Sequence, residues 1–500
     1  MRRVRFVIAF LIIATMILPS TRALFVKPSF PDYTPNGMPD FDEKQDNWGP
    51  GAGIFTWCCP VAVANSLWWL DSEYESIMFA NPIPPPAISD HFPLVTPYGA
   101  WDDHDANNVF GLVPNLAFCM DTDGMRTGTV HSGTRWVDVA PGIQLYLVQQ
   151  GVTAWFQVHS SDFPDFGWID TQTEQCQDVE LFLEFWQQNV PGGPWTNTTI
   201  TNPSLEFGHC VTTAGVEAAA AQLLISDPYF DVVTPGLPSH NDAQFVSHDP
   251  YGVAQWMMGP GPYGPAQPIW ELVNYCQIAM GLPPTYHAFI RGAVATSGVF
   301  PVSTAGVVGI TGYKLLFKET MGNPLCLSAT IDYHWNFSCE KWNGVAWVAS
   351  GISGSSTPVT GYSIPALPTV DLPYDVYVLP TTGPNAVAWN DWLRINFTFH
   401  WTYNSNSYST AYSAKLHVHP ADIAGTAPVA FPYLGADLAV GTKDLNVLGV
   451  QWGKTVPPGT DPTSNLARAD MNGDGAIGTK DLNILGTQWG KTWTNTPPPG

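Results

Sequence analysis

The stretch WCCPVAVANSLWWL, Trp57–Leu70, decides how the first part of this 500-residue chain folds. Pro60 suits the first turn of a helix, where its missing N–H costs no hydrogen bond. The residues after it are apolar on nearly all sides, which is typical of a buried helix. The sequence therefore predicts a buried helix that begins at Cys58 and Cys59. The positive end of a helix dipole stabilises the thiolate form of a cysteine at that place, and a thiolate is a nucleophile.

The composition restricts the partners of the chain. Only 12% of the residues are charged, and 42 acidic residues against 19 basic ones leave a net charge of −23. Phosphate backbones repel such a polyanion, so we expect no nucleic-acid partner. The chain is 45% hydrophobic and holds 21 Trp, 18 Tyr and 25 Phe, so it can bury large cores, and disorder is excluded for most of its length.

The first residues predict a secretory signal. Three arginines precede a 13-residue apolar run, Phe6–Leu18, and small residues follow before a cleavage point after Ala23. Thirteen apolar residues are fewer than the roughly 20 that span a membrane, so we expect export with cleavage and no membrane attachment afterwards. A secreted, extracellular protein also meets conditions in which disulfides form.

Changes of composition predict a multidomain chain. Residues 41–297 mix helical and strand patterns, and Asp178–Gln188 is expected to be a helix. Residues 298–424 contain short alternating runs rich in Thr, Val and aromatics, which predict an antiparallel β-sandwich. The successive segments are a signal, a linker, a first domain, the sandwich, a small helical module with a calcium loop and a Pro-rich tail, over residues 1–23, 24–40, 41–297, 298–424, 430–493 and 494–500.

The module at 430–493 holds two near-identical segments. Gly441–Thr455 and Gly478–Thr492 agree at 13 of 15 positions. The second is preceded by a loop with side-chain oxygens at loop positions 1, 3, 5 and 12, a glycine at position 6, where the chain turns sharply, and a backbone carbonyl at position 7. This spacing predicts a calcium site of the EF-hand type. Its expected ligands are Asp470, Asn472, Asp474, Ala476 and Asp481.

The first copy has lost this loop. Tyr433 and Gly435 occupy the positions that match Asp470 and Asn472, so we expect one calcium site. The alternative is that the second loop is only an Asn/Asp/Gly turn that caps the helix near Asp481.

Two such loop–helix copies resemble a dockerin, the module that attaches extracellular enzymes to cohesin-bearing scaffold proteins. The resemblance implies a cohesin-type partner and a setting among polysaccharide-degrading enzymes. Dockerins normally have two calcium loops, so the degraded first loop is a departure. The alternative is a calcium-stabilised structural repeat without a partner.

Two further motifs complete a candidate active site with Cys58. The segment around Gly208-His209 reads as a strand, and a second strand, Leu223–Ser226, ends at Asp227. Antiparallel pairing of these strands would place His209 beside Cys58 and Asp227 beside the far imidazole nitrogen. That is the nucleophile, base and orienting carboxylate of a thiol hydrolase.

This region, over about 40–295, resembles the papain-like cysteine peptidases of the bacteriocin-leader-processing kind. The family's Cys-Gly-Pro helix start, Gly-His on a strand and Asn/Asp-Pro after the next strand match Cys58–Pro60, Gly208-His209 and Asp227-Pro228. The resemblance implies an α+β papain-like domain that cleaves a peptide or isopeptide bond in a peptide or protein substrate. It also implies an oxyanion-hole glutamine, for which Gln45, 13 residues before Cys58, is the candidate.

The cysteines leave alternatives open. Cys59 replaces the family's glycine and is a second possible nucleophile, and a disulfide between Cys58 and either Cys59 or Cys210 would abolish the nucleophile. Cys326 and Cys339 could bridge a hairpin of the sandwich.

Two other functions compete with the thiol hydrolase. One is a non-catalytic binding or assembly component whose aromatic-rich sandwich holds extracellular polysaccharide. The other is a glycoside hydrolase, which needs two carboxylates about 5–10 Å apart, and no local motif indicates them.

Overall fold

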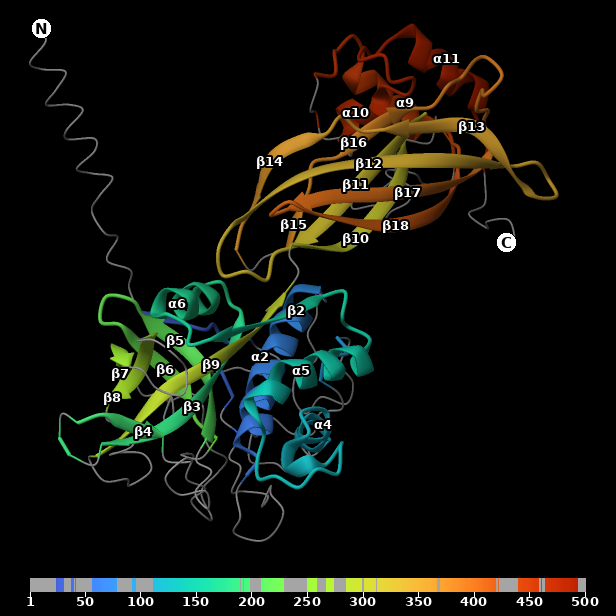
Figure 1. Cartoon of the computed structure of the whole chain (residues 1–500). Coiled ribbons are helices and arrows are strands. Elements are labelled where there is room, and N and C mark those ends of the chain that lie inside the picture. The colour runs from blue at the N-terminus through green and yellow to red at the C-terminus, as the bar shows by residue number, and fades with distance from the viewer. Residues whose placement is uncertain are drawn as a thin grey trace, which may run out of the picture. The chain divides into compact units, whose positions relative to one another are not determined.

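The computed structural model divides the chain into two compact units. The first comprises Met1–Val299 with Pro324–Leu327, and the second Phe300–Asn323 with Ser328–Gly500 (Figure 1). The expected signal and the Pro-rich tail lie outside the described residues. Those residues are 24–30, 37–39, 41, 56–78, 92–95, 111–188, 190–191, 193–197, 208–228, 250–258, 267–273, 285–298, 301–311, 313–366, 369–419, 421, 439–457, 460 and 464–492.

The first unit combines an antiparallel sheet with helices. Its strands are β1 (Phe25–Val26), β2 (Phe156–Asp162), β3 (Asp178–Gln188), β4 (Trp195–Asn197), β5 (Gly208–Glu217), β6 (Gln222–Ser226), β7 (Pro250–Met258), β8 (Gln267–Val273) and β9 (Tyr286–Gly298). The hydrogen-bonded pairs β5–β6, β6–β7, β7–β8, β8–β9, β9–β3 and β3–β5 form a closed ring. Three further strands pair with strands of this ring: β1 with β5, β2 with β9, and β4 with β3.

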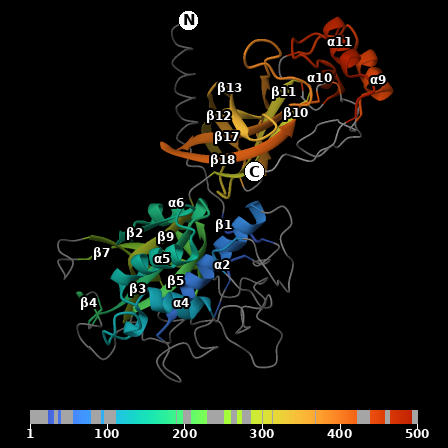
Figure 2. The same ribbon diagram turned by 90° about the vertical axis from the view of Figure 1, so that its right-hand side faces the viewer.

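The helices of this unit include the one expected after the cysteine pair. They are α2 (Cys58–Met78), α4 (Leu112–Cys119), α5 (Trp136–Gln150) and α6 (Phe166–Glu174), with a short 3-10 turn η1 (Thr122–Gly124). Residues 59–75 of α2 are all buried, as expected for the apolar residues up to Leu70, and Asp71, Glu73 and Glu75 are buried as well. Helix α2 packs against β5 and α4, an arrangement that can be followed in Figure 2.

The helix expected over Asp178–Gln188 is wrong, because this segment is strand β3. It lies between β9 and β5 and is covered on both faces. Leu181 and Leu183 enter the main core of the unit, while Asp178 and Glu180, which alternate with them, are buried as well. The segment has the period of two that is typical of a strand, but Phe182 and Trp186 interrupt the polar residues of one face and obscure this alternation.

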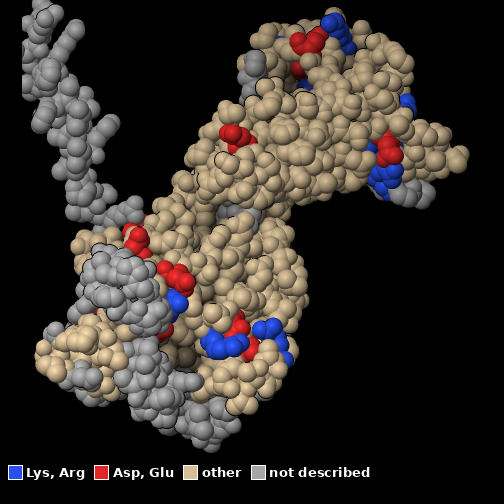
Figure 3. Space-filling view, in the orientation of Figure 1, with Lys and Arg blue, Asp and Glu red and all other residues tan. Residues whose placement is uncertain are grey.

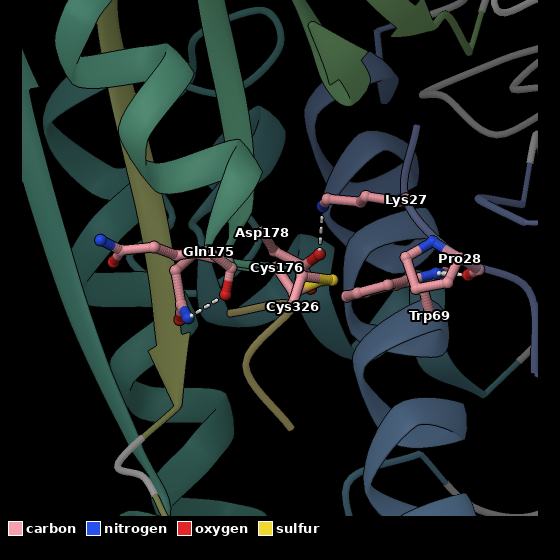
Figure 4. Close-up of a disulfide and its surroundings, with 8 residues drawn as sticks. Lys27, Pro28, Trp69, Gln175, Cys176, Asp178 and Cys326 are labelled. Atoms are coloured by element: carbon pink, nitrogen blue, oxygen red, sulfur yellow. Dashed lines mark hydrogen bonds and ion pairs between the residues drawn. A yellow bond between two sulfur atoms is a disulfide. The ribbon is translucent and has the colours of Figure 1, made fainter. Parts of the chain in front are cut away.

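The pairing of Cys326 with Cys339 is also wrong. Cys326 forms a disulfide with Cys176, with a Cα–Cα distance of 5.4 Å (Figure 4). Cys339 is a buried free thiol on a strand of the second unit. The reason is that Pro324–Leu327 groups with the first unit rather than with the strands on either side of it in the chain. Beside this disulfide, Lys27 and Asp178 form a fully buried ion pair of 2.7 Å.

The second unit contains two antiparallel sheets around one core. Its strands are β10 (Val302–Thr311), β11 (Lys314–Gly322), β12 (Ala329–Trp342), β13 (Trp347–Ser355), β14 (Val359–Ile364), β15 (Thr369–Asp371), β16 (Asp375–Val378), β17 (Trp392–Tyr403) and β18 (Asn406–His417). One sheet joins β10, β11, β15 and β16, and the other joins β13, β12, β17 and β18, with β14 on β12. Phe317, Trp335 and Phe397 come from both sheets and share one hydrophobic core. The expectation of a β-rich chain with more than one part is confirmed.

The aromatic residues of these strands point mainly into that core. On β12, Tyr333, Trp335 and Phe337 are buried, whereas His334 and Asn336 between them are exposed. The alternation explains how the chain carries many aromatics and few charges: Thr, Ser, Asn and His cover the outer face. On the molecular face shown in Figure 3, most of the described surface is neither acidic nor basic.

Three helices follow the strands within the same unit. They are α9 (Thr442–Gln451), α10 (Asn465–Ala469) and α11 (Thr479–Gln488). Leu448 of α9 and Leu485 of α11 stand at matching places in the repeat and meet in a small core with Met471 and Ile477. Among the described helices of the whole chain, none combines the length and the apolar character needed to cross a membrane.

Candidate functional site

Three expected catalytic side chains are brought together in the first unit. Cys58 is the first residue of α2, His209 lies near the start of β5, and Asp227 follows the end of β6. The strands β5 and β6 pair antiparallel with Thr212 opposite Ser226, so the chain that leaves β6 runs alongside the first half of β5. This register carries Asp227 to the imidazole of His209.

The imidazole of His209 connects the carboxylate to the thiol. Its Nε2 atom lies 2.7 Å from Oδ1 of Asp227, and its side chain is also hydrogen-bonded to Cys58. Since Asp227 engages Nε2, Nδ1 is the nitrogen left for the thiol. The side chains of His209 and Asp227 are only 5% and 1% exposed, respectively, so their interaction is little screened by water.

Opposing effects act on the pKa of His209. Burial by itself lowers the pKa of the imidazole, but the charge and hydrogen bond of Asp227 and the hydrogen bond with Cys58 outweigh it and raise the pKa well above its usual value. The imidazolium form is therefore favoured next to Cys58. A neighbouring cation at the N-terminal end of a helix is the setting in which a thiolate forms.

A network of buried polar side chains holds α2 against the two strands. Thr212 Oγ1 donates a 2.6 Å hydrogen bond to the carbonyl of Ala62, one turn after Cys58. Asn65 Nδ2 donates to Ser226 Oγ at 3.3 Å, and Ser226 in turn donates to the carbonyl of Pro39 at 2.8 Å. Sequence reasoning missed these residues. The signal was Asn65 itself, since a polar side chain within a buried helix must find a partner.

The neighbouring cysteines differ from Cys58. Cys59 and Cys210 are each 1% exposed and carry no disulfide, whereas Cys58 is partly exposed. Burial, followed by a hydrogen bond with the Cys59 thiol, raises the pKa of Cys210 well above its usual value. Cys210 is thus a protonated, inaccessible thiol, and the structure has no disulfide from Cys58 to Cys59 or Cys210. Gln45, the expected oxyanion-hole residue, lies outside the described residues.

The expected calcium loop lies between α10 and α11. Asp470 and Asp481 are 4% and 0% exposed. Asp481 accepts hydrogen bonds from the N–H groups of Met471 and Gly478 at 2.8 and 2.9 Å, and Asp470 accepts from that of Gly475 at 3.1 Å. The left-handed φ of +81° at Gly475 accounts for a glycine at loop position 6.

The side-chain oxygen atoms of the loop are suited to bind a hard divalent cation. Burial, and also the charge of Asp470, raises the pKa of Asp481, although hydrogen bonds from the loop backbone act the other way. Two buried carboxylates that repel one another, with Asn472 and Asp474 beside them, are the oxygen ligands that calcium prefers. Within the described part of the chain, no three His, Cys, Asp or Glu side chains already converge as a metal-binding group. Here the loop carboxylates bind backbone N–H groups.

The first repeat keeps the helix start without the loop. Asp444, which matches Asp481, accepts a 2.7 Å hydrogen bond from the N–H of Gly441, as Asp481 does from Gly478. Tyr433 and Gly435, the replaced loop positions, lie outside the described residues.

Comparisons with known proteins identify no family for this chain. No protein-family model matches it, and a search of curated proteins finds no match. Among solved structures, β-glucuronidase 2 of Bacteroides uniformis, covalently bound to cyclophellitol-6-carboxylate aziridine, is similar over 53% of this chain, with 9% sequence identity and a TM-score of 0.13. The match covers 26% of the glucuronidase chain, and a likeness this weak carries no argument about function.

Proposed function

We propose that this chain is a secreted thiol hydrolase of the papain-like cysteine peptidase type that cleaves peptide or isopeptide bonds. The proposal rests on the two hydrogen bonds of His209. One joins its Nε2 to Asp227, and the other joins its side chain to Cys58 at the first position of α2. The three residues come from a helix and from the ends of two strands, and buried hydrogen bonds tie these elements together.

The proposed reaction proceeds through an acyl-enzyme. The Cys58 thiolate attacks the scissile carbonyl, and the imidazolium of His209 gives its proton to the leaving amine as the C–N bond breaks. The thioester that remains on Cys58 is then hydrolysed by water. His209 takes a proton from that water, the resulting hydroxide attacks the thioester carbonyl, and the C–S bond breaks, so that the carboxylic acid leaves and the Cys58 thiolate is restored beside the imidazolium. Asp227 keeps the imidazole oriented and stabilises its charged form in both steps.

The C-terminal helices support a second part of the proposal, that the enzyme docks through a dockerin-like module to a cohesin-type scaffold. Leu445 and Leu482 are 39% and 40% exposed, and Trp452 and Trp489 are 45% and 48% exposed. Because these residues occupy matching positions in the two repeats, a partner protein would find the same exposed apolar side chains on each copy. Asp470, Asn472, Asp474, Ala476 and Asp481 would hold calcium, which would fix the loop before α11 in one conformation.

The rival binding role for the strands of the second unit gains no support. A carbohydrate-binding face requires exposed aromatic rings, and the large aromatics of β12 and β17 are mostly buried, among them Trp335, Phe399 and Trp401.

The test compares hydrolysis of a broad peptide library by the chain without residues 1–23 and by two variants. Cys58→Ala removes the proposed nucleophile, and Cys59→Ala removes the adjacent buried thiol as a matched control. We expect loss of cleavage in the first variant alone. Equal cleavage by wild type and Cys58→Ala would refute the peptidase proposal.

A further inference from the structure

A buried lysine from the strands of the second unit reaches the calcium loop. Lys314, the first residue of β11, has a side chain that is only 8% exposed. Its Nζ atom donates a 2.6 Å hydrogen bond to the carbonyl of Ala467 and lies 3.8 Å from Oδ2 of Asp470, at loop position 1. Burial lowers the pKa of Lys314, while the charges of Asp470 and Asp481 favour its ammonium form, so this lysine faces the acidic side of the loop.

The loop and the start of β11 are held together by more than this ion pair. The N–H of Tyr313 donates a 3.0 Å hydrogen bond to the carbonyl of Met471. Gly473, with a left-handed φ of +71°, faces β16 so closely that a Cβ there would stand 2.8 Å from a methyl of Val378. The main chain at the start of β11 is thus held close to the loop at points other than the Lys314 side chain.

Lys314 is placed to compete with a metal cation. A calcium ion bound to Asp470 Oδ2 would lie about 2.3–2.6 Å from that oxygen, so the ion and the ammonium 3.8 Å from the same oxygen would be at most about 6 Å apart. Coulomb's law for charges of +2 and +1 at that distance, with the dielectric constant of bulk water, corresponds to about a tenfold change in Kd. Lys480, the other cation at the loop, pairs with Asp474 at 2.7 Å but is 73% exposed, so water screens it.

We propose that Lys314 is a built-in counter-cation of the calcium loop, which stabilises the buried carboxylates without metal and weakens calcium binding. The inference rests on the proposed calcium site and adds to it a residue that sets its affinity. Its consequence is that calcium binding responds to how β11 meets the loop, and so is coupled to the strands of the second unit.

The test measures calcium affinity by titration calorimetry, with terbium luminescence as a second readout, on the chain without residues 1–23. Lys314→Met removes the charge and keeps most of the aliphatic part of the side chain. Lys314→Gln also removes the charge but ends in a polar amide. Lys314→Arg keeps the charge. Lys318→Met is the matched control, because Lys318 is on the same strand but pairs with Asp371. We expect about tenfold tighter calcium binding by Lys314→Met and Lys314→Gln, and wild-type affinity within about twofold for the other two.

Each outcome decides a separate point. Calcium binding by wild type with no gain in either neutral variant overturns the role of Lys314 and leaves the calcium site in place. Binding only by the neutral variants supports the role in its strongest form. Absence of binding in wild type and in all variants overturns the calcium site and the inference together.

Discussion

Removing the carboxylate of Asp227 should slow the reaction of Cys58 with an alkylating reagent. In the wild type, Asp227 is 1% exposed and bonds the imidazole at 2.7 Å, and it helps to raise the pKa of His209. A hydrogen bond to a charged group contributes about 1.5–3 kcal/mol to the stability of the charged state. Loss of that contribution lowers the pKa of His209 and so reduces the population of the imidazolium that stabilises the thiolate. We therefore expect Asp227→Ala to lower the alkylation rate constant of Cys58 at pH 7 about 10- to 100-fold.

The assay follows iodoacetamide modification by peptide mapping, so that Cys58 and Cys59 are read separately. Asp227→Asn, which keeps the shape and an acceptor oxygen but not the charge, should give an intermediate rate. Asp162→Asn is the control, because Asp162 pairs with Arg291 at 2.8 Å in the same unit and is largely exposed. Wild-type alkylation of Cys58 in a folded Asp227→Ala variant would refute the thiolate–imidazolium argument.

Two further predictions concern stability. Burial and the charge of Asp178 raise the pKa of Glu180 to about 8, whereas the unfolded carboxyl ionises near its usual 4.5, so stability should fall as the pH rises from about 4.5 to 8. Urea unfolding across that range should show the free energy of unfolding fall with pH in the wild type and fall less steeply in Glu180→Gln. The same dependence on pH in both proteins would count against the burial argument. Cys326→Ala removes a disulfide between residues 150 positions apart in the chain and should lower the free energy of unfolding by about 2–5 kcal/mol. Cys339→Ala should retain most of the stability. Equal thermal midpoints for wild type and Cys326→Ala would contradict a stabilising role of the disulfide.

Local signals in the sequence were sufficient for part of the site. Pro60 and the apolar run after it mark the start of α2, and the strand patterns around His209 and before Asp227 lead to β5 and β6. Each of these signals depends on neighbours in the chain, so it can be recognised without knowing the fold. The closeness of the three side chains follows once the strands pair antiparallel.

Other features depend on contacts between distant residues. Asp178–Gln188 looked helical because Phe182 and Trp186 interrupt the polar residues on one face of the strand and obscure its alternation. Cys326 was assigned to the wrong partner because its four-residue segment groups with the first unit, which no local pattern reveals. For the same reason, nothing in the sequence near Lys314 indicated the loop at Asp470, 156 positions further on.

The most direct test of the central claim is to locate the covalent intermediate. A peptide substrate from the library would be mixed with the chain lacking residues 1–23, quenched in acid during turnover and mapped by mass spectrometry. The proposed mechanism predicts an acyl group attached as a thioester to Cys58 and absent from the Cys58→Ala variant. An acyl group on Cys59, or turnover by Cys58→Ala at the wild-type rate, would contradict it.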